Sequence, residues 1–310
     1  MVNRRAFLKS AAATSLLGAS GVSGCIGQFG EQPYSDGEIR FLMSPTEPQD
    51  QMRAQYTPIK ERLQSYTDAD SVSMKYAADY AATLSALNSA TADIAETGPF
   101  AAALGVNTEK VDIILQRHGY GSWTYRSNIV TREDSDIENL SDLEGKTVAL
   151  ADALSASGSL YPLYMLKQAG LSIPDEPGNP SGADFEPQWS SHAAAKEALV
   201  NGQADAAGVG YFIVRGDDSD YAEGIRPLKV KKGIPRAPIL VSPDLSDDEK
   251  STLTTAFTEA SDSLYLGEDG EADTDDDLWF DDVREASVDT YQPVVDVANE
   301  LGYGEDIFKK

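Results

Sequence analysis

The chain of 310 residues is poor in three kinds of residue that carry much protein chemistry. It has one cysteine, Cys25, so a disulfide within the chain is impossible. Its two histidines, His118 and His192, do not form a paired-histidine metal motif. Lysine and arginine number 25 against 51 aspartates and glutamates, which gives a formal net charge of −26. Because nucleic-acid binding needs a basic surface, we expect no nucleic-acid partner, and we also expect no metal and no cofactor.

The excess of acidic residues is spread through every segment of the chain. Self-repulsion of this size opposes folding in dilute buffer, but the Debye length shrinks to about 3 Å in molar salt. The composition therefore predicts a protein of a hypersaline medium, typical of a halophilic archaeon. An acidic run at residues 267–277 lacks the spacing of a calcium-binding EF-hand, and we interpret it as a solvated loop.

Long hydrophobic runs are also missing. The apolar stretch Ala11–Val22 is too short to span a bilayer, and Arg4-Arg5 precedes it, which predicts a twin-arginine export signal over residues 1–25. The signal ends in Val-Ser-Gly-Cys, which resembles a lipobox, so Cys25 is the predicted lipidation site. The alternative is a plain cleavable signal with a free cysteine. We expect an exported protein, anchored by its lipid to the outer face of the cytoplasmic membrane.

Beyond a linker predicted at residues 26–37, short apolar runs alternate with helical patterns. The expected strands are 38–43, 71–76, 93–96, 111–117, 127–131, 146–151, 204–209, 225–231 and 238–241. The expected helices are 50–66, 80–88, a helix that follows the turn 155–158 and ends at residue 168, 190–201, 246–264 and 293–301. Such alternation predicts an α/β fold with largely parallel sheets.

Short motifs in a fixed order connect these elements to a known family. They include Phe41–Glu47, Tyr56-Thr57-Pro58, Asp79-Tyr80-Ala81, Ala92–Ala95, Gly98-Pro99-Phe100, Tyr125–Val130, Leu143–Ala149, Ser155–Gly158, Ser191-His192, Gly202–Ala207, Ile234-Pro235 and Asp289–Val294. Each motif is a weak signal by itself. In this order, over about residues 38–302, they resemble the periplasmic binding proteins of phosphate, phosphite and phosphonate ABC transporters.

The resemblance implies a type II periplasmic-binding-protein fold, in which two α/β lobes are joined by two crossing strands and the ligand lies in the cleft between them. Here it predicts one lobe from residues 38–127 and 240–310, and a second lobe from 128–239. Ser127–Thr131 and Pro235–Val241 are the expected crossings. The implied partners are a small anionic ligand and the permease of an ABC transporter.

The turn Ser155-Ala156-Ser157-Gly158 combines hydroxyls and backbone N–H groups at the start of a helix, where the dipole favours an anion. Local sequence alone favours ordinary N-capping by Ser155 or Ser157. The resemblance instead implies that this turn grips the phosphorus oxyanion. Ala156 stands where the family usually has another hydroxyl, so one side-chain donor is missing.

The resemblance also implies that the hydroxyls of Tyr80 and Tyr125 point into the cleft and that His192 hydrogen-bonds the oxyanion. Taken singly, a tyrosine is more often a core residue and a lone histidine a structural one. If His192 is protonated in the complex, affinity falls as the pH rises through its pKa.

Aminoalkylphosphonate binders carry two carboxylates at positions that correspond here to Phe212, or its neighbour Tyr211, and to Ala237. A buried ammonium without a counter-charge is costly, so an amino-bearing ligand is disfavoured. Arg236 offers either a bidentate grip on an oxyanion or a surface position at the hinge. The expected ligand is phosphate, phosphite or a small alkylphosphonate.

We therefore predict a binding protein rather than an enzyme, which closes on its anion and presents it to a permease. One alternative is a ligand sensor that acts on a membrane receptor. Another is a phosphoester hydrolase with His192 as its base, but the chain offers no convincing nucleophile or metal set for it.

Overall fold

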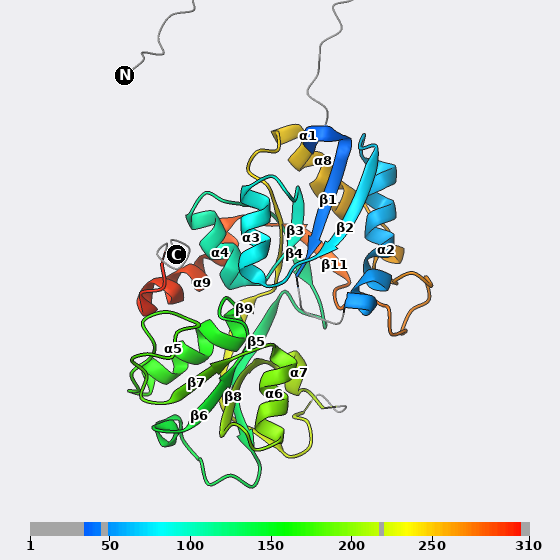
Figure 1. Cartoon of the computed structure of the whole chain (residues 1–310). Helices are drawn as coiled ribbons and strands as arrows, with labels where there is room; N and C mark the ends of the chain where they lie inside the picture. The colour runs from blue at the N-terminus through cyan, green and yellow to red at the C-terminus, as the bar shows by residue number, and fades with distance from the viewer. Residues whose placement is uncertain (1–33, 45–48, 217–219, 305–310) are drawn as a thin grey trace, which may run out of the picture. The chain divides into compact units, whose positions relative to one another are not determined.

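The computed structural model describes residues 34–44, 49–216 and 220–304, which all belong to one compact unit. The predicted signal and Cys25 lie outside the described residues. None of the helices within these ranges has the length and apolar character that crossing a membrane requires. The described chain forms two sheets with helices packed on them (Figure 1).

The first sheet has six strands in the order β11-β4-β10-β3-β1-β2. The strands are β1 (Glu38–Met43), β2 (Ser71–Tyr76), β3 (Ile94–Glu96), β4 (Asp112–His118), β10 (Pro238–Val241) and β11 (Asp282–Glu285). β1 runs parallel to β2 and β3, whereas β10 runs antiparallel to β3 and β4, and β11 runs antiparallel to β4. The sheet is therefore mixed rather than purely parallel.

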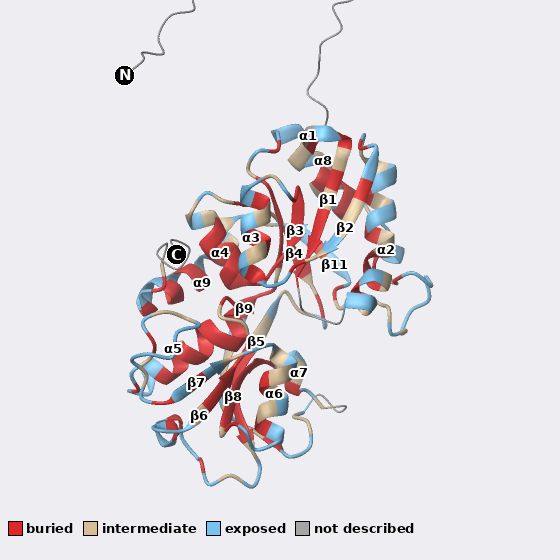
Figure 2. Cartoon of the chain, in the orientation of Figure 1, coloured by how far each residue is buried: buried red, intermediate tan, exposed pale blue. Residues whose placement is uncertain are grey.

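The strands β1, β3 and β10 in the middle of the first sheet are buried on both faces, to which successive side chains of a strand point alternately (Figure 2). Phe41 packs in a core with α2 (Gln49–Tyr66) and α8 (Asp247–Thr258). Its neighbour Leu42 packs in a second core with the helices α3 (Tyr80–Asn88), α4 (Pro99–Asn107) and α9 (Val288–Leu301). The strand thus sits between two helical layers, as its apolar run predicts.

The second sheet has five strands in the order β7-β6-β8-β5-β9. The strands are β5 (Thr124–Arg132), β6 (Thr147–Leu150), β7 (Glu186–Trp189), β8 (Ala206–Gly210) and β9 (Ile225–Pro235). The helices on it are α5 (Tyr161–Gln168), α6 (His192–Val200) and the short α7 (Tyr211–Val214). β6 is parallel to β7 and β8, and β5 is antiparallel to β8 and β9.

The chain passes between the two sheets twice. It first leaves β4 for β5 through residues 119–123, and it returns from β9 to β10 through Arg236 and Ala237. The backbone N–H of Arg236 donates to the carbonyl of Trp123 at 3.0 Å, so the two passages are hydrogen-bonded to each other. Ser127–Thr131 pairs with β8 inside the second sheet, so its predicted role as a crossing is wrong. The exact lobe boundaries stay a prediction.

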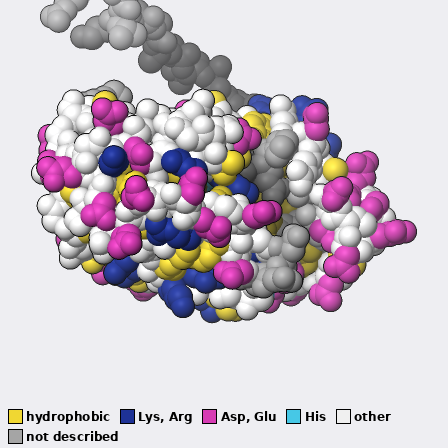
Figure 3. Space-filling model, turned by 90° about the horizontal axis from the view of Figure 1, so that it is seen from below, with side chains coloured by type: hydrophobic (Ala, Val, Ile, Leu, Met, Phe, Trp, Pro, Cys, Tyr) yellow, Lys and Arg dark blue, Asp and Glu magenta, His cyan; other side chains and the backbone are white. Residues whose placement is uncertain are grey.

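Acidic side chains are scattered over the face shown in Figure 3, among smaller groups of lysine and arginine. This distribution agrees with the spread of acids along the sequence. On this face the carboxylates are not gathered in one patch.

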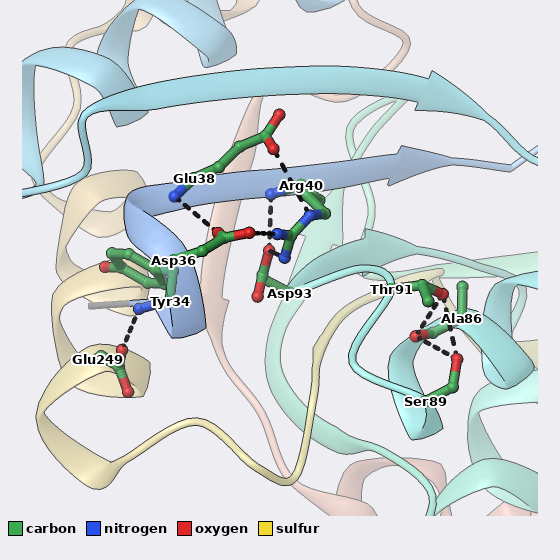
Figure 4. Close-up of polar contacts among 9 residues, drawn as sticks. All are labelled: Tyr34, Asp36, Glu38, Arg40, Ala86, Ser89, Thr91, Asp93 and Glu249. Carbon is green, nitrogen blue, oxygen red and sulfur yellow. Dashed lines mark hydrogen bonds and ion pairs between the residues drawn. The ribbon is translucent and has the colours of Figure 1, made fainter. Parts of the chain in front are cut away.

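The folded body begins earlier than the predicted linker allows (Figure 4). Tyr34 opens the short helix α1 (Tyr34–Gly37), is buried, and donates its backbone N–H to Glu249 Oε1 at 2.5 Å. Arg40 of the following strand β1 forms ion pairs with Asp36 and Asp93. The linker predicted at residues 26–37 must therefore end before Tyr34.

Most expected elements are present, and the differences have local causes. The helix expected at 246–264 ends at Thr258 and is followed by a 3₁₀ turn at 262–265, and β9 extends four residues further than predicted, to Pro235. Five of the helices and strands in the described residues were not predicted, namely α1, α4, α7, β7 and β11. α4 is apolar on every side because the sheet and α9 enclose it, and β7 and β11 are edge strands with one buried residue each.

Candidate functional site

A cavity of about 90 Å³ lies between elements of the two sheets. The seven residues that sequence reasoning selected all line it: Tyr80, Tyr125, Ser155, Ala156, Ser157, His192 and Arg236. They come from five separate segments of the chain, so the fold brings them together. Further lining residues are Thr97, Gly98, Pro99, Arg117, Tyr120, Phe212, Ala237 and Trp279.

The turn after β6 forms the polar wall of this cavity. Ser155 caps the π-helical turn η2 (Ala156–Leu160), which continues into α5, and its Oγ accepts the backbone N–H of Gly158 at 3.1 Å. The N–H groups of Ala156 and Ser157 begin the helix and have no intrahelical acceptor. Capping by Ser155 and binding of an anion are therefore compatible. Ser155 accepts the N–H of Gly158 and leaves other backbone N–H groups of the turn at the cavity.

His192 approaches the same turn from the start of α6. Its Nε2 lies 3.1 Å from Ser155 Oγ, and its Nδ1 accepts the backbone N–H of Gly210 at 3.3 Å. Because Nδ1 acts as an acceptor, the neutral ring carries its proton on Nε2. Nε2 then donates to Ser155, and the hydroxyl proton of Ser155 remains for another acceptor. A hydroxyl that keeps its proton in this way can donate to a ligand oxygen.

Burial lowers the pKa of His192 from its usual 6.5 to about 4, and no carboxylate opposes this shift. The ring is therefore neutral at neutral pH. The expectation that affinity falls as pH rises, which required a protonated His192, does not hold for this environment. His192 acts as a neutral donor toward Ser155.

Two tyrosines form further walls. Tyr80 is the first residue of α3, where the Asp79 side chain accepts the N–H of Ala82 at 2.7 Å and so fixes the start of the helix. Burial raises the pKa of Tyr125 to about 12, against the opposing effects of its hydrogen bonds with Ser157 and of nearby Arg236. Burial likewise raises the pKa of Tyr80. Both phenols are protonated and can donate.

Arg236 supplies positive charge from the second passage. Its side chain is 8% exposed, so the alternative of a surface hinge residue is wrong. Nε donates to the carbonyl of Ser122 at 2.8 Å, and the guanidinium lies 5.2 to 5.9 Å from the ring centroids of Tyr120, Tyr125 and Trp279. Among the described residues no carboxylate forms an ion pair with it, and burial lowers its pKa.

Sequence reasoning missed Arg117, a second cation at this cavity. Its guanidinium is buried, pairs with Glu96 and lies 4.6 Å from the ring centroid of Trp279. Burial acts to lower the pKa of Arg117, but the neighbouring Glu96 carboxylate outweighs it and the pKa is raised. Its position in β4, directly after Gln116 and the apolar run Ile113–Leu115, is the sequence signal for it.

The positions expected to lack charge do face the cavity. Phe212 and Ala237 line it, and Phe212 meets the His192 ring at a centroid distance of 5.2 Å, edge to face. No aspartate or glutamate is present among the described lining residues. His118, for which no role was predicted, lies with its Nδ1 2.5 Å from Asp281 Oδ1.

A donor-rich cavity between two α/β sheets, which the chain joins by two passages, defines a solute-binding protein of the periplasmic-binding-protein type. Residues 41–291 match the model of the family described as ABC transporter, phosphonate, periplasmic substrate-binding protein. The chain belongs to this family.

Two curated relatives carry related names. Phosphate-import protein PhnD of Mycolicibacterium smegmatis is 31% identical over 173 residues, which cover 54% of this chain and 53% of that protein. The Phosphonates-binding periplasmic protein of Escherichia coli is 27% identical over 228 residues, which cover 71% of this chain and 65% of that protein. The chain thus spans between about half and two thirds of the length of these relatives.

Solved structures show the same fold. The binding protein component of an ABC phosphonate transporter from Pseudomonas aeruginosa has a TM-score of 0.69 at 22% identity, with 87% of each chain covered. PhnD1 of Prochlorococcus marinus, in complex with methylphosphonate, has a TM-score of 0.66 at 15% identity, covering 86% of this chain and 99% of that one. The arrangement of two sheets around a cleft is therefore that of periplasmic binding proteins.

Proposed function

We propose that this protein is the solute-binding component of an ABC transporter and captures a small tetrahedral phosphorus oxyanion. The observation that carries the proposal is the convergence of neutral and cationic donors on a cavity whose described lining residues include no carboxylate. The names of the two curated relatives, one for phosphate and one for phosphonates, support the ligand class.

The donors have distinct tasks. The Ser155 hydroxyl, the Ser157 hydroxyl and the first N–H groups of η2 bind the oxygens of the anion at the helix start, and the Ser157 groups also hydrogen-bond Tyr125. Arg236 supplies positive charge, and no carboxylate of the described residues forms an ion pair with it. Tyr80 and Tyr125 close the cage from the side, and Phe212 excludes water from it.

The cavity selects by size and charge. At about 90 Å³ it accommodates one tetrahedral group with a short substituent, which fits phosphate, phosphite or a small alkylphosphonate. A ligand ammonium would meet Phe212 and Ala237 instead of acids, and an unpaired buried ammonium is costly. We therefore infer that an aminoalkylphosphonate binds more weakly than these anions.

Ligand exchange requires the two sheets and their helices to separate and close about residues 119–123 and 236–237. The family's members are transport binding proteins, so we propose delivery to a membrane permease and no catalysis. A receptor-coupled sensor would use the same cavity, and co-purification with a permease would favour transport over it.

We further propose export by the twin-arginine signal, lipidation at Cys25 and function in a hypersaline medium. The residues of the signal and the net charge of −26 support these proposals. Replacing Arg4-Arg5 with Lys-Lys should retain the protein in the cytoplasm, and Cys25→Ser should release it from the membrane. Mass spectrometry of the mature N-terminus tests the lipid itself.

The ligand is tested by titrating the protein that lacks residues 1–25 in molar KCl, with thermal stability as the readout. Phosphate, phosphite, methylphosphonate, 2-aminoethylphosphonate and sulfate form the panel. Saturable stabilisation by one of the first three supports the proposal, since a ligand that binds the native state raises its stability. Preference for 2-aminoethylphosphonate or for sulfate contradicts it, and turnover of a chromogenic phosphoester contradicts the absence of catalysis.

A further inference from the structure

A second hollow opens beside the cavity, and nothing in the proposed function uses it. Its volume is about 410 Å³. It shares four wall residues with the smaller cavity, Tyr120, Tyr125, Phe212 and Arg236. The two hollows are therefore adjacent and meet at these four side chains.

The larger hollow is basic in a strongly acidic protein. Arg126, Arg215, Lys232 and Arg236 line it, and no aspartate or glutamate is found among its described lining residues. Acidic residues outnumber basic ones by 51 to 25 in the chain, and on the face shown in Figure 3 they are scattered. Among the described lining residues of this hollow, basic side chains therefore outnumber acidic ones, the reverse of the chain as a whole.

Two of these cations face each other across neighbouring strands. Arg126 of β5 is the register partner of Lys232 of β9. Like charges placed directly opposite in an antiparallel pair are destabilising. Neither residue forms an ion pair within the described part of the chain, although the Arg126 guanidinium lies 3.6 Å from the centroid of the Tyr211 ring.

A β-bulge creates this juxtaposition. Tyr125 pairs with Ile234, and the register then shifts so that Arg126 meets Lys232 while Gly233 is left over. Gly233 has a φ of 82°, a conformation that glycine adopts at little cost. Without the bulge, Arg126 would stand opposite a glycine. The bulge therefore places Arg126 and Lys232 opposite each other beside the hollow.

We propose that this hollow is a subsite for a second anionic group of the ligand. The ligand class is a phosphonate or phosphate monoester whose substituent ends in a carboxylate or a second phosphoryl group. Its phosphoryl head occupies the small cavity, and its anionic tail lies between Arg126 and Lys232. The inference rests on the proposed function, because it assigns the head group to the cavity already described.

The test uses isothermal titration calorimetry in molar KCl with four probes. Methylphosphonate has no tail, 2-hydroxyethylphosphonate has a neutral polar tail, and phosphonoacetate and 3-phosphonopropionate end in carboxylates. We expect at least one carboxylate-tailed probe to bind about tenfold more tightly than 2-hydroxyethylphosphonate. The double variant R126Q/K232Q should remove this advantage and leave the Kd of methylphosphonate within about twofold.

The matched control is K146Q/K229Q, which changes the net charge equally at exposed residues outside both hollows. It should keep the advantage of the carboxylate tail. The single variant K232Q, at an exposed residue, provides the same comparison should the double variant fold poorly. Melting temperature should stay the same or rise in both hollow variants, because a like-charge pair is removed.

Three results overturn the subsite. One is equal affinity for the hydroxyl and carboxylate tails in the unaltered protein. Another is an equal loss of affinity for all four probes in R126Q/K232Q, which would mean that the two cations attract every anion alike and do not contact the tail. The third is an equal loss in K146Q/K229Q. Failure of every probe and of phosphate and phosphite to bind instead contradicts the proposed function itself.

Discussion

Ser155 Oγ and His192 Nε2 lie 3.1 Å apart, and the N–H of Gly210 determines the direction of the hydrogen bond between them. The N–H occupies Nδ1, so the imidazole must donate through Nε2. The serine hydroxyl therefore keeps its proton for a further acceptor. The backbone amide of Gly210 on β8 therefore determines that the Ser155 hydroxyl can act as a donor toward the cavity.

This chain of donors predicts that Ser155 and His192 act together. Ser155→Ala and His192→Ala should each weaken anion binding roughly 10- to 100-fold, as expected for loss of a hydrogen bond to a charged group. The double variant should lose little more than either single variant, since both remove one donor. Calorimetric titration measures this, and Ser172→Ala, at an exposed serine outside the cavity, is the control. Fully additive losses would contradict the shared donor.

The lowered pKa of His192, about 4, predicts a pH dependence of stability. The unfolded chain has a histidine pKa near 6.5 and binds the proton more tightly than the native state. The contribution of His192 is therefore fully present above pH 6.5 and is lost as the pH falls toward 4, by at most about 3 kcal/mol. The acid-side loss of unfolding free energy should be smaller in His192→Gln than in the unaltered protein. Identical slopes between pH 6.5 and 4 would show that the ring is not held neutral.

Gly158 has no room for a side chain. A Cβ there would lie 2.2 Å from the Ala151 Cβ and 2.7 Å from the His192 Cε1. Gly158→Ala should therefore lower the unfolding free energy by about 1 to 3 kcal/mol and displace His192, so that anion binding weakens as well. Gly304→Ala is the control, because no atom lies within 4 Å of its added Cβ. A Gly158→Ala protein with unchanged melting and binding would contradict the packing at this turn.

The buried pair of Arg117 and Glu96 predicts a large loss of stability on neutralisation. Both side chains are at most 2% exposed, and the Glu96 carboxylate also accepts the Tyr56 hydroxyl. Glu96→Gln leaves the guanidinium without its counter-charge and should cost about 3 to 5 kcal/mol of unfolding free energy. Urea unfolding in molar KCl measures it. Asp112→Asn breaks the half-exposed pair with Lys250 and should cost about 1 kcal/mol or less. Equal losses in the two variants would contradict the role of burial.

The helices and strands could be predicted from the sequence where the spacing of apolar residues reflects which face of the element is buried. The strands Glu38–Met43, Ser71–Tyr76 and Pro238–Val241 and the helix Tyr80–Asn88 begin and end at the predicted residues. The helix Pro99–Asn107 could not be predicted in this way, because its neighbours enclose it and its sequence has no polar face that would reveal a helical period. Edge strands escape prediction for the opposite reason, since few of their side chains are buried. Asp282–Glu285 is mostly exposed and is held by pairing with β4 rather than by apolar side chains.

The seven selected residues, which all line one cavity, could be predicted because the turn chemistry and the motifs of the resemblance are local in sequence. The pairing of Arg117 with the ring of Trp279 is not local, since the two are brought together only when β11 joins β4. The pairing of Arg126 with Lys232 is not local either, because it depends on a β-bulge that Gly233 permits. Tertiary contacts of this kind need the topology before the residues can be paired.

Arg236 belongs at once to the return passage between the sheets and to the walls of both hollows. Its backbone carbonyl accepts the buried Tyr291 hydroxyl at 2.7 Å, and its side chain holds the carbonyl of Ser122 in the other passage. In the proposed function, an anion that binds this guanidinium therefore acts on the passage between the sheets and on the ligand cavity through a single residue. We expect a substitution at Arg236 to change how the proposed binding protein opens as well as which ligand it holds.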